Sequence, residues 1–309
     1  MWKSLCYNER KGIWGGFVSL ERLQEKIRKR KMPLVLDFVP AGEKLPQCVL
    51  EHSKSWLEGY FHFALELLER LKGVVPGVRF SFSGFAMEGP EGLLALSRLT
   101  ERAKRLGYCV LLTVPEAMSS REAEYFADTF FAPRCPWHFD ILVTSAYLGT
   151  DSVRPYVEKL KDSNRDLLVV VRTGNKSAPE LQDLLTGGRL VHMAAADKIN
   201  RLAQELVGRW GYSRIGLVAA PGAGESLRTL RSKYPQLFFL LDSYDYNNVS
   251  AKKCAAAFDK YGHGAAVLAG TKISQAWLAA QTDGYDYAEQ AALAVERIQR
   301  NLTGSVTIL

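Results

Sequence analysis

The sequence lacks the features that are typical of a membrane protein or of a secreted protein. No stretch approaches the roughly 18 consecutive apolar residues that a membrane-spanning helix requires, so we expect no membrane partner. Residues 1–16 carry charged and aromatic side chains and no apolar segment before a small-residue cleavage site, so we expect no secretory signal. The five cysteines are scattered singly: Cys6, Cys48, Cys109, Cys135 and Cys254. Such a set is typical of free thiols in a reducing cytoplasm, where we place the protein.

The common motifs for metals and nucleotides are also missing. The five histidines form no HxH or HExxH pattern, and the chain has no GxSxG elbow and no GxxxxGK[ST] loop, so we expect no metal and no cofactor. A net charge of +7 over 309 residues is a weak signal for nucleic acid. We interpret the densest basic run, residues 26–31 (KIRKRK), as the solvated end of a helix and expect no nucleic-acid partner.

The chain does contain a regular alternation of apolar runs and helical patterns. Eight runs resemble buried strands: 33–40, 77–84, 108–115, 140–147, 166–173, 214–220, 237–244 and 265–272. Helical patterns follow them at 56–71, 93–106, 120–131, 151–161, 192–210, 225–234, 250–258 and 288–302, the fourth with Asp151 as its expected N-cap. With no break in composition, this order predicts an α/β protein, a single (β/α)8 barrel over residues 33–309.

Residues 1–32 form a basic extension ahead of the barrel. Its helical pattern begins at Ser19 and places Leu20, Leu23 and Ile27 on one side. We expect this helix to cap the bottom of the barrel or to pack on a partner subunit.

In such barrels the active site is built where the strands end and the following loops begin. The polar candidates at these places, taken as ligand-binding residues, are Asp37, Arg79, Ser145, Arg172, Thr173, Asn175, Asn247 and Lys272. Lys272 ends the eighth run, next to the loop where barrel phosphate sites often lie. Arg172 either attracts a phosphate or carboxylate or pairs with an acid such as Asp242. Residues 222–224 (GAG) form either an anion nest or a tight turn.

Three segments resemble the long (type 2) form of the orotidine 5'-phosphate decarboxylase family. They are residues 140–156 (DILVTSAYLGTDSVRPY), 171–178 (VRTGNKSA) and 78–92, and the resemblance covers about residues 33–280. It implies a barrel, a phosphorylated substrate and a homodimer.

The sequence departs from this family at the positions that carry its chemistry. The family has a Lys at the end of strand two and an Asp-x-Lys-x-x-Asp array after strand three, whose lysine protonates the carbanion left by carbon dioxide. Here Arg79 takes the first position, and Thr113, Pro115 and Met118 take those of the array, which occurs nowhere in the chain. The family's phosphate-binding Arg after strand eight corresponds to Lys272.

We therefore expect a barrel without decarboxylase activity that binds a phosphorylated small molecule such as a pyrimidine nucleotide. Two other functions stay open: a working decarboxylase with unusual residues, and a different barrel enzyme that uses the carboxylates Glu116, Asp242 and Asp245. A structural or regulatory protein whose barrel is plugged by Phe82, Tyr244 and Tyr246 is a further alternative.

Overall fold

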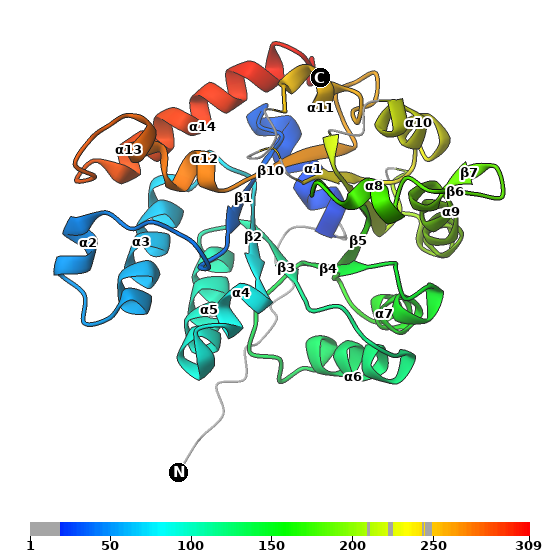
Figure 1. Ribbon diagram of the computed structural model, residues 1–309, viewed down its shortest axis with the longest axis horizontal. Helices are drawn as coiled ribbons and strands as arrows, with labels where there is room; N and C mark the ends of the chain where they lie inside the picture. Colours follow the sequence, from blue (N-terminus) through cyan, green and yellow to red (C-terminus); the bar gives the residue numbers. More distant parts are fainter. Residues whose placement is uncertain (1–18, 209–210, 222–224, 243, 245–248) are drawn as a thin grey trace.

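The protein folds into a closed barrel of eight parallel strands surrounded by helices (Figure 1). The computed structural model describes residues 19–208, 211–221, 225–242, 244 and 249–309. The strands are β1 (Leu34–Phe38), β2 (Gly77–Ser81), β3 (Cys109–Thr113), β4 (Ile141–Ser145), β5 (Asp166–Arg172), β8 (Ile215–Ala219), β9 (Phe239–Leu241) and β10 (Ala265–Ala269). They pair in the order β1-β10-β9-β8-β5-β4-β3-β2, and β1 closes the ring with β2. The predicted (β/α)8 barrel is confirmed.

Helices connect consecutive strands and cover the outside of the barrel (Figure 1). They are α2 (Gln47–Glu51), α3 (Trp56–Arg70), α4 (Phe82–Ala86), α5 (Gly89–Arg105), α6 (Ser120–Phe131), α7 (Arg154–Lys161), α8 (Ala178–Leu181), α9 (Val191–Ala203), α10 (Glu225–Lys233), α11 (Ala251–Ala255), α12 (Thr271–Ser274), α13 (Ala276–Ala279) and α14 (Tyr287–Thr303). A hairpin of β6 (Leu185–Thr186) and β7 (Arg189–Leu190) follows α8, in a segment for which the sequence predicted no element. No helix in the described ranges combines the length and apolar character needed to cross a bilayer.

Each predicted strand run contains a strand, because strands buried on both faces appear in the sequence as continuous apolar runs. Every residue of β4, β8 and β10 is buried, and these strands share one core with the inner faces of the helices. The predicted runs extend beyond the carboxyl ends of the strands, where the chain leaves the barrel as a loop or a short helix.

Several predicted boundaries were wrong. The run 77–84 ends at Ser81, whose hydroxyl accepts the Gly84 N–H at 3.2 Å and so caps α4. Asp151 lies in a 3-10 turn, and α7 begins at Arg154 after Val153. The helix predicted over 192–210 ends at Ala203, whose carbonyl accepts the Ser213 hydroxyl at 2.7 Å. The helix predicted over 250–258 is shorter, α11 alone.

Helix α1 (Ser19–Arg30) closes the bottom of the barrel, which is one of the two placements that the sequence allowed. Figure 1 shows it across the centre of the ring of strands. Leu20, Leu23 and Ile27 are buried in the barrel core. The Leu20 N–H donates to Asp166 Oδ2 at 2.6 Å, at the amino end of β5. Burial raises the pKa of the Asp166 carboxyl to about 6, although Leu20 and Arg214 donate to it.

Candidate functional site

Two neighbouring strands bring Asp37 and Arg79 together at the C-terminal face of the barrel. The residues are register partners on β1 and β2, and the guanidinium binds the carboxylate through both oxygens, Nε–Oδ1 at 2.7 Å and Nη2–Oδ2 at 2.6 Å. Each side chain is 16% exposed. Bidentate pairing of this kind fixes both side chains and balances their charges. The cation on β2 is therefore a paired guanidinium in a fixed position.

The end of β3 carries no ionisable proton donor at the three positions of interest. Thr113 is the last residue of the strand, and its Oγ1 is buried with no hydrogen-bond partner among the described residues. Pro115 is half-buried, and Met118 is 84% exposed. Glu116, the nearby carboxylate, is exposed to solvent in the loop. A hydroxyl, a pyrrolidine ring and a thioether cannot replace an ammonium as a source of protons.

Arg172 at the end of β5 pairs with an acid, but that acid is Asp183 rather than the Asp242 suggested as an example. Nε and Nη2 of Arg172 each lie 2.9 Å from a carboxylate oxygen of Asp183. On the other side, His192 Nδ1 lies 3.1 Å from Asp183 Oδ1. Burial disfavours the carboxylate, yet hydrogen bonds and charge from Arg172 and His192 outweigh it and hold the pKa of Asp183 below its ordinary value.

The segment after β5 also holds Thr173 and Asn175 in a local network. The Thr173 hydroxyl donates to Asn175 Oδ1 at 2.5 Å and accepts Gln182 Nε2 at 2.8 Å. The Thr173 N–H donates to Gln182 Oε1 at 2.8 Å. Gln182, Asp183 and His192 were not among the expected ligand-binding residues, because no spacing or periodicity in the sequence links them to the strand end.

Ser145 and Lys272 occupy the remaining described candidate positions. Ser145 is buried at the end of β4, and its Oγ accepts the Tyr147 N–H at 3.4 Å. Lys272, in α12 after β10, donates from Nζ to the Tyr244 carbonyl at 2.6 Å and stands 4.4 Å from the centre of the Tyr244 ring. The lysine is exposed, whereas Tyr244 is buried.

Some predicted residues do not belong to this face or cannot be placed on it. The Phe82 ring packs edge-on against Phe130 of α6, at 5.6 Å between ring centres, and against Trp137 at 4.9 Å. It therefore lies outside the barrel, and its predicted role as a plug was wrong. Asn247, Asp245, Tyr246 and the glycines Gly222 and Gly224 lie outside the described residues.

The structure thus brings Asp37, Ser145, Arg172 and Thr173 to the carboxyl ends of β1, β4 and β5, with Arg79 beside Asp37 on β2, Asn175 on the loop after β5 and Lys272 on α12. Three cations lie there, Arg79, Arg172 and Lys272, together with hydroxyl and amide groups. Asp37 and Asp183 pair with the two arginines. Such a set suits an anionic ligand that also offers hydroxyl groups. In the described ranges no group of three His, Cys, Asp or Glu side chains is arranged to hold a metal ion.

Comparison with known proteins gives one consistent result. The chain is 30% identical over 237 residues to orotidine 5'-phosphate decarboxylase of Rhodopirellula baltica, covering 74% of this chain and 78% of that protein. The decarboxylase of Clostridium novyi is 25% identical over 284 residues, with 92% and 98% covered. No protein-family model matches the chain.

Solved structures agree in fold. A putative orotidine-monophosphate decarboxylase from Toxoplasma gondii superposes with a TM-score of 0.75 at 24% identity, covering 93% of this chain and 98% of that one. A putative decarboxylase from Streptomyces avermitilis gives 0.74 at 21% identity, with 94% and 96% covered. The sequence relationship and the shared barrel lead to one conclusion: the chain belongs to the orotidine 5'-phosphate decarboxylase family.

Proposed function

We propose that this protein binds a phosphorylated pyrimidine nucleotide at the C-terminal face of its barrel and does not decarboxylate it by the lysine route of the family. The observation that carries the proposal is the end of β3. The three positions that correspond to the family's array hold Thr113, Pro115 and Met118. Membership of a family whose named relatives are orotidine 5'-phosphate decarboxylases supports the choice of ligand.

The loss of activity follows from the proton that the reaction needs. When carbon dioxide leaves, the carbanion must take a proton from a positioned acid, a step to which general acids contribute about 10²–10⁴-fold. Arg79 stands on the neighbouring strand, but a guanidinium keeps its proton far above neutral pH and here is held by Asp37. Neither Thr113 nor the loop beyond it supplies an ammonium in its place.

The binding of a nucleotide rests on the charges that remain. Lys272 is our candidate for the phosphate, because it is exposed beyond β10, where barrels commonly bind phosphate groups. Arg79 and Arg172, whose charges Asp37 and Asp183 balance, present fixed N–H donors, and Asp37, Ser145, Thr173 and Asn175 offer partners for ribose hydroxyls and the base. Asn247 stays a prediction of the same kind.

Calorimetric titration of the full chain with UMP and with orotidine 5'-phosphate tests the proposal. We expect saturable micromolar binding of UMP and no release of carbon dioxide from orotidine 5'-phosphate above the uncatalysed rate. Lys272→Gln should weaken UMP about tenfold, the effect of about 1.4 kcal/mol of lost interaction. Lys198→Gln removes the same charge from an exposed position on α9 and should change nothing.

Each part of the proposal can fail on its own. Flat heats at millimolar UMP and orotidine 5'-phosphate would refute nucleotide binding. Turnover of orotidine 5'-phosphate would refute the loss of activity and favour a working decarboxylase with unusual residues.

We also propose that two copies associate through the C-terminal face, as the resemblance to the family implies. The loops after the adjacent strands β3, β4 and β5 expose large apolar side chains, with Met118 at 84%, Leu148 at 44% and Leu185 at 76%. Exposed apolar side chains of this kind are suited to burial between two copies of the chain.

A further inference from the structure

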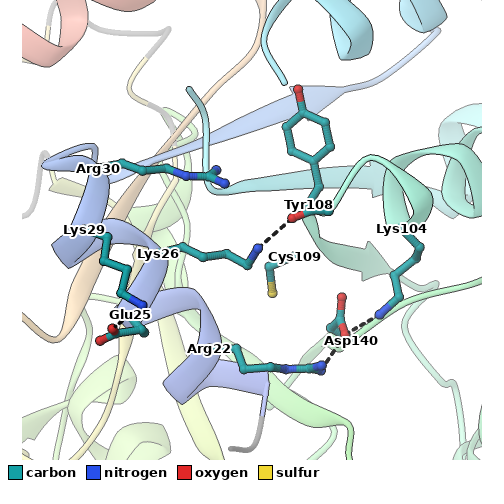
Figure 2. Close-up of a pocket in the computed structure, with 10 residues that line it drawn as sticks. Arg22, Glu25, Lys26, Lys29, Arg30, Lys104, Tyr108, Cys109 and Asp140 are labelled. Atoms are coloured by element: carbon teal, nitrogen blue, oxygen red, sulfur yellow. Dashed lines mark hydrogen bonds and ion pairs between the residues drawn. The ribbon is translucent and has the colours of Figure 1, made fainter. Parts of the chain in front are cut away.

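A second polar site lies at the opposite end of the barrel from the candidate nucleotide site. A pocket of about 460 Å³ opens between α1, the end of α5 and the segments that lead into β3 and β4. Figure 2 shows Lys26 and Arg22 of α1 reaching across it toward Tyr108 and Asp140, respectively. The pocket is therefore built where the N-terminal helix meets the barrel, and none of the residues discussed above for nucleotide binding lines it.

The charges around this pocket do not balance. Two carboxylates line it, Glu25 and Asp140, against five cations: Arg22, Lys26, Lys29, Arg30 and Lys104. The lining thus carries an excess of three positive charges. In Figure 2, Arg22, Lys26 and Arg30 reach from α1 toward the barrel, whereas Lys29 turns toward Glu25. Like charges gathered in this way repel one another, and a bound anion would relieve the repulsion.

Both carboxylates already bind cations that line the pocket. Asp140 Oδ1 accepts Arg22 Nη2 at 2.7 Å and Lys104 Nζ at 2.6 Å, while Oδ2 accepts the Val110 N–H at 2.9 Å. Glu25 binds Lys29 at 3.0 Å, and Arg28 donates to it as well. The two acids thus pair with three of the five cations that line the pocket: Arg22, Lys104 and Lys29.

Lys26 and Arg30 instead donate to main-chain carbonyls. Lys26 Nζ lies 2.6 Å from the Gly107 oxygen, and Arg30 Nη1 lies 2.7 Å from the Val75 oxygen. Burial lowers the pKa of both groups, and for Lys26 the neighbouring Arg30 lowers it further. An ammonium has three N–H donors and a guanidinium five, so one carbonyl contact leaves each side chain able to bind an anion as well.

We propose that this pocket is a binding site for a small phosphate ester that carries at least two negative charges, independent of the nucleotide site at the C-terminal face. Lys26 and Arg30 hold the phosphate, and Arg22, Lys29 and Lys104 add positive potential. The volume lies within the range of about 300–1,000 Å³ that small-molecule pockets occupy, so it accommodates more than an inorganic ion. Because the pocket joins α1 to the barrel, binding also stabilises the attachment of this helix.

Inorganic pyrophosphate is a suitable probe, titrated calorimetrically into the full chain at constant ionic strength. We expect saturable binding and a rise in melting temperature. Lys26→Gln keeps an N–H donor for the Gly107 carbonyl but removes the charge, and it should weaken pyrophosphate tenfold or more. Lys198→Gln, the matched loss of an exposed lysine on α9, should leave the affinity unchanged.

A second variant distinguishes binding in this pocket from binding at the C-terminal face. Lys272→Gln should leave pyrophosphate binding at the bottom of the barrel intact, whatever it does to UMP. Unchanged pyrophosphate binding in Lys26→Gln would overturn the proposal, and so would its loss in Lys272→Gln or the absence of binding to the unaltered chain. If Lys26→Gln does not fold, as judged by circular dichroism, Arg30→Gln tests the other side chain that holds the phosphate and should weaken pyrophosphate as well.

Discussion

At the scale of single residues, the group around Asp183 shows how a strand-end arginine is held. Arg172 is only 8% exposed, so its charge depends on the carboxylate that binds it through both oxygens. Replacing Asp183 by Asn keeps the shape but leaves the guanidinium without its counter-charge. We expect a loss of about 1–3 kcal/mol in the free energy of unfolding at pH 7, discounted because Asp183 is partly exposed.

The pH dependence of this effect has a definite sign. The pKa of Asp183 is lowered on folding, so its contribution to stability is present above its ordinary value of 3.8 and is lost as pH falls below that value. Urea unfolding should therefore separate the original chain from Asp183→Asn at pH 7 and bring them together toward pH 3. Asp162→Asn, at an exposed position after α7, should track the original chain throughout. A difference that grows on acidification would contradict the assignment.

At the scale of elements, α1 packs against the barrel and shares its core. Leu23 is fully buried, and Gly77 on β2 gives it room, since a Cβ there would lie 3.2 Å from Leu23 Cδ1. Leu23→Ala should cost about 2–5 kcal/mol, the range for large-to-small changes in a core. Leu94→Ala, on α5 where the side chain is 45% exposed, serves as the control and should cost far less.

The same experiment tests whether residues 19–32 unfold with residues 33–309. If α1 shares the cooperative transition of the barrel, Leu23→Ala shifts a single unfolding curve seen alike by fluorescence and circular dichroism. A separate early transition, or an effect no larger than that of Leu94→Ala, would mean that α1 is an independent appendage.

At the scale of the whole molecule, the barrel could be predicted and much of its polar chemistry could not. The strands could be predicted because a strand buried on both faces appears in the sequence as a continuous apolar run, as in Asp166–Arg172. Residues 82–84 were misassigned to a strand because phenylalanine favours strands, whereas the Ser81 cap starts the helix α4 there. Asp183 and the pocket under α1 escaped notice because their partners meet only in the folded chain, as Arg22 and Asp140 do.

Association of two copies is a property of the whole molecule, and the exposed apolar loops give a way to test it. Leu185 is 76% exposed in the hairpin that follows β5, so Leu185→Asp should leave the barrel folded and introduce a charge into the proposed interface. We expect sedimentation velocity to show a dimer for the original chain and for Leu94→Asp, and monomers for Leu185→Asp. A charge costs little on a surface that faces water but several kcal/mol where two copies must bury it. A monomeric original chain, or a dimer that Leu185→Asp leaves intact, would place association elsewhere or exclude it.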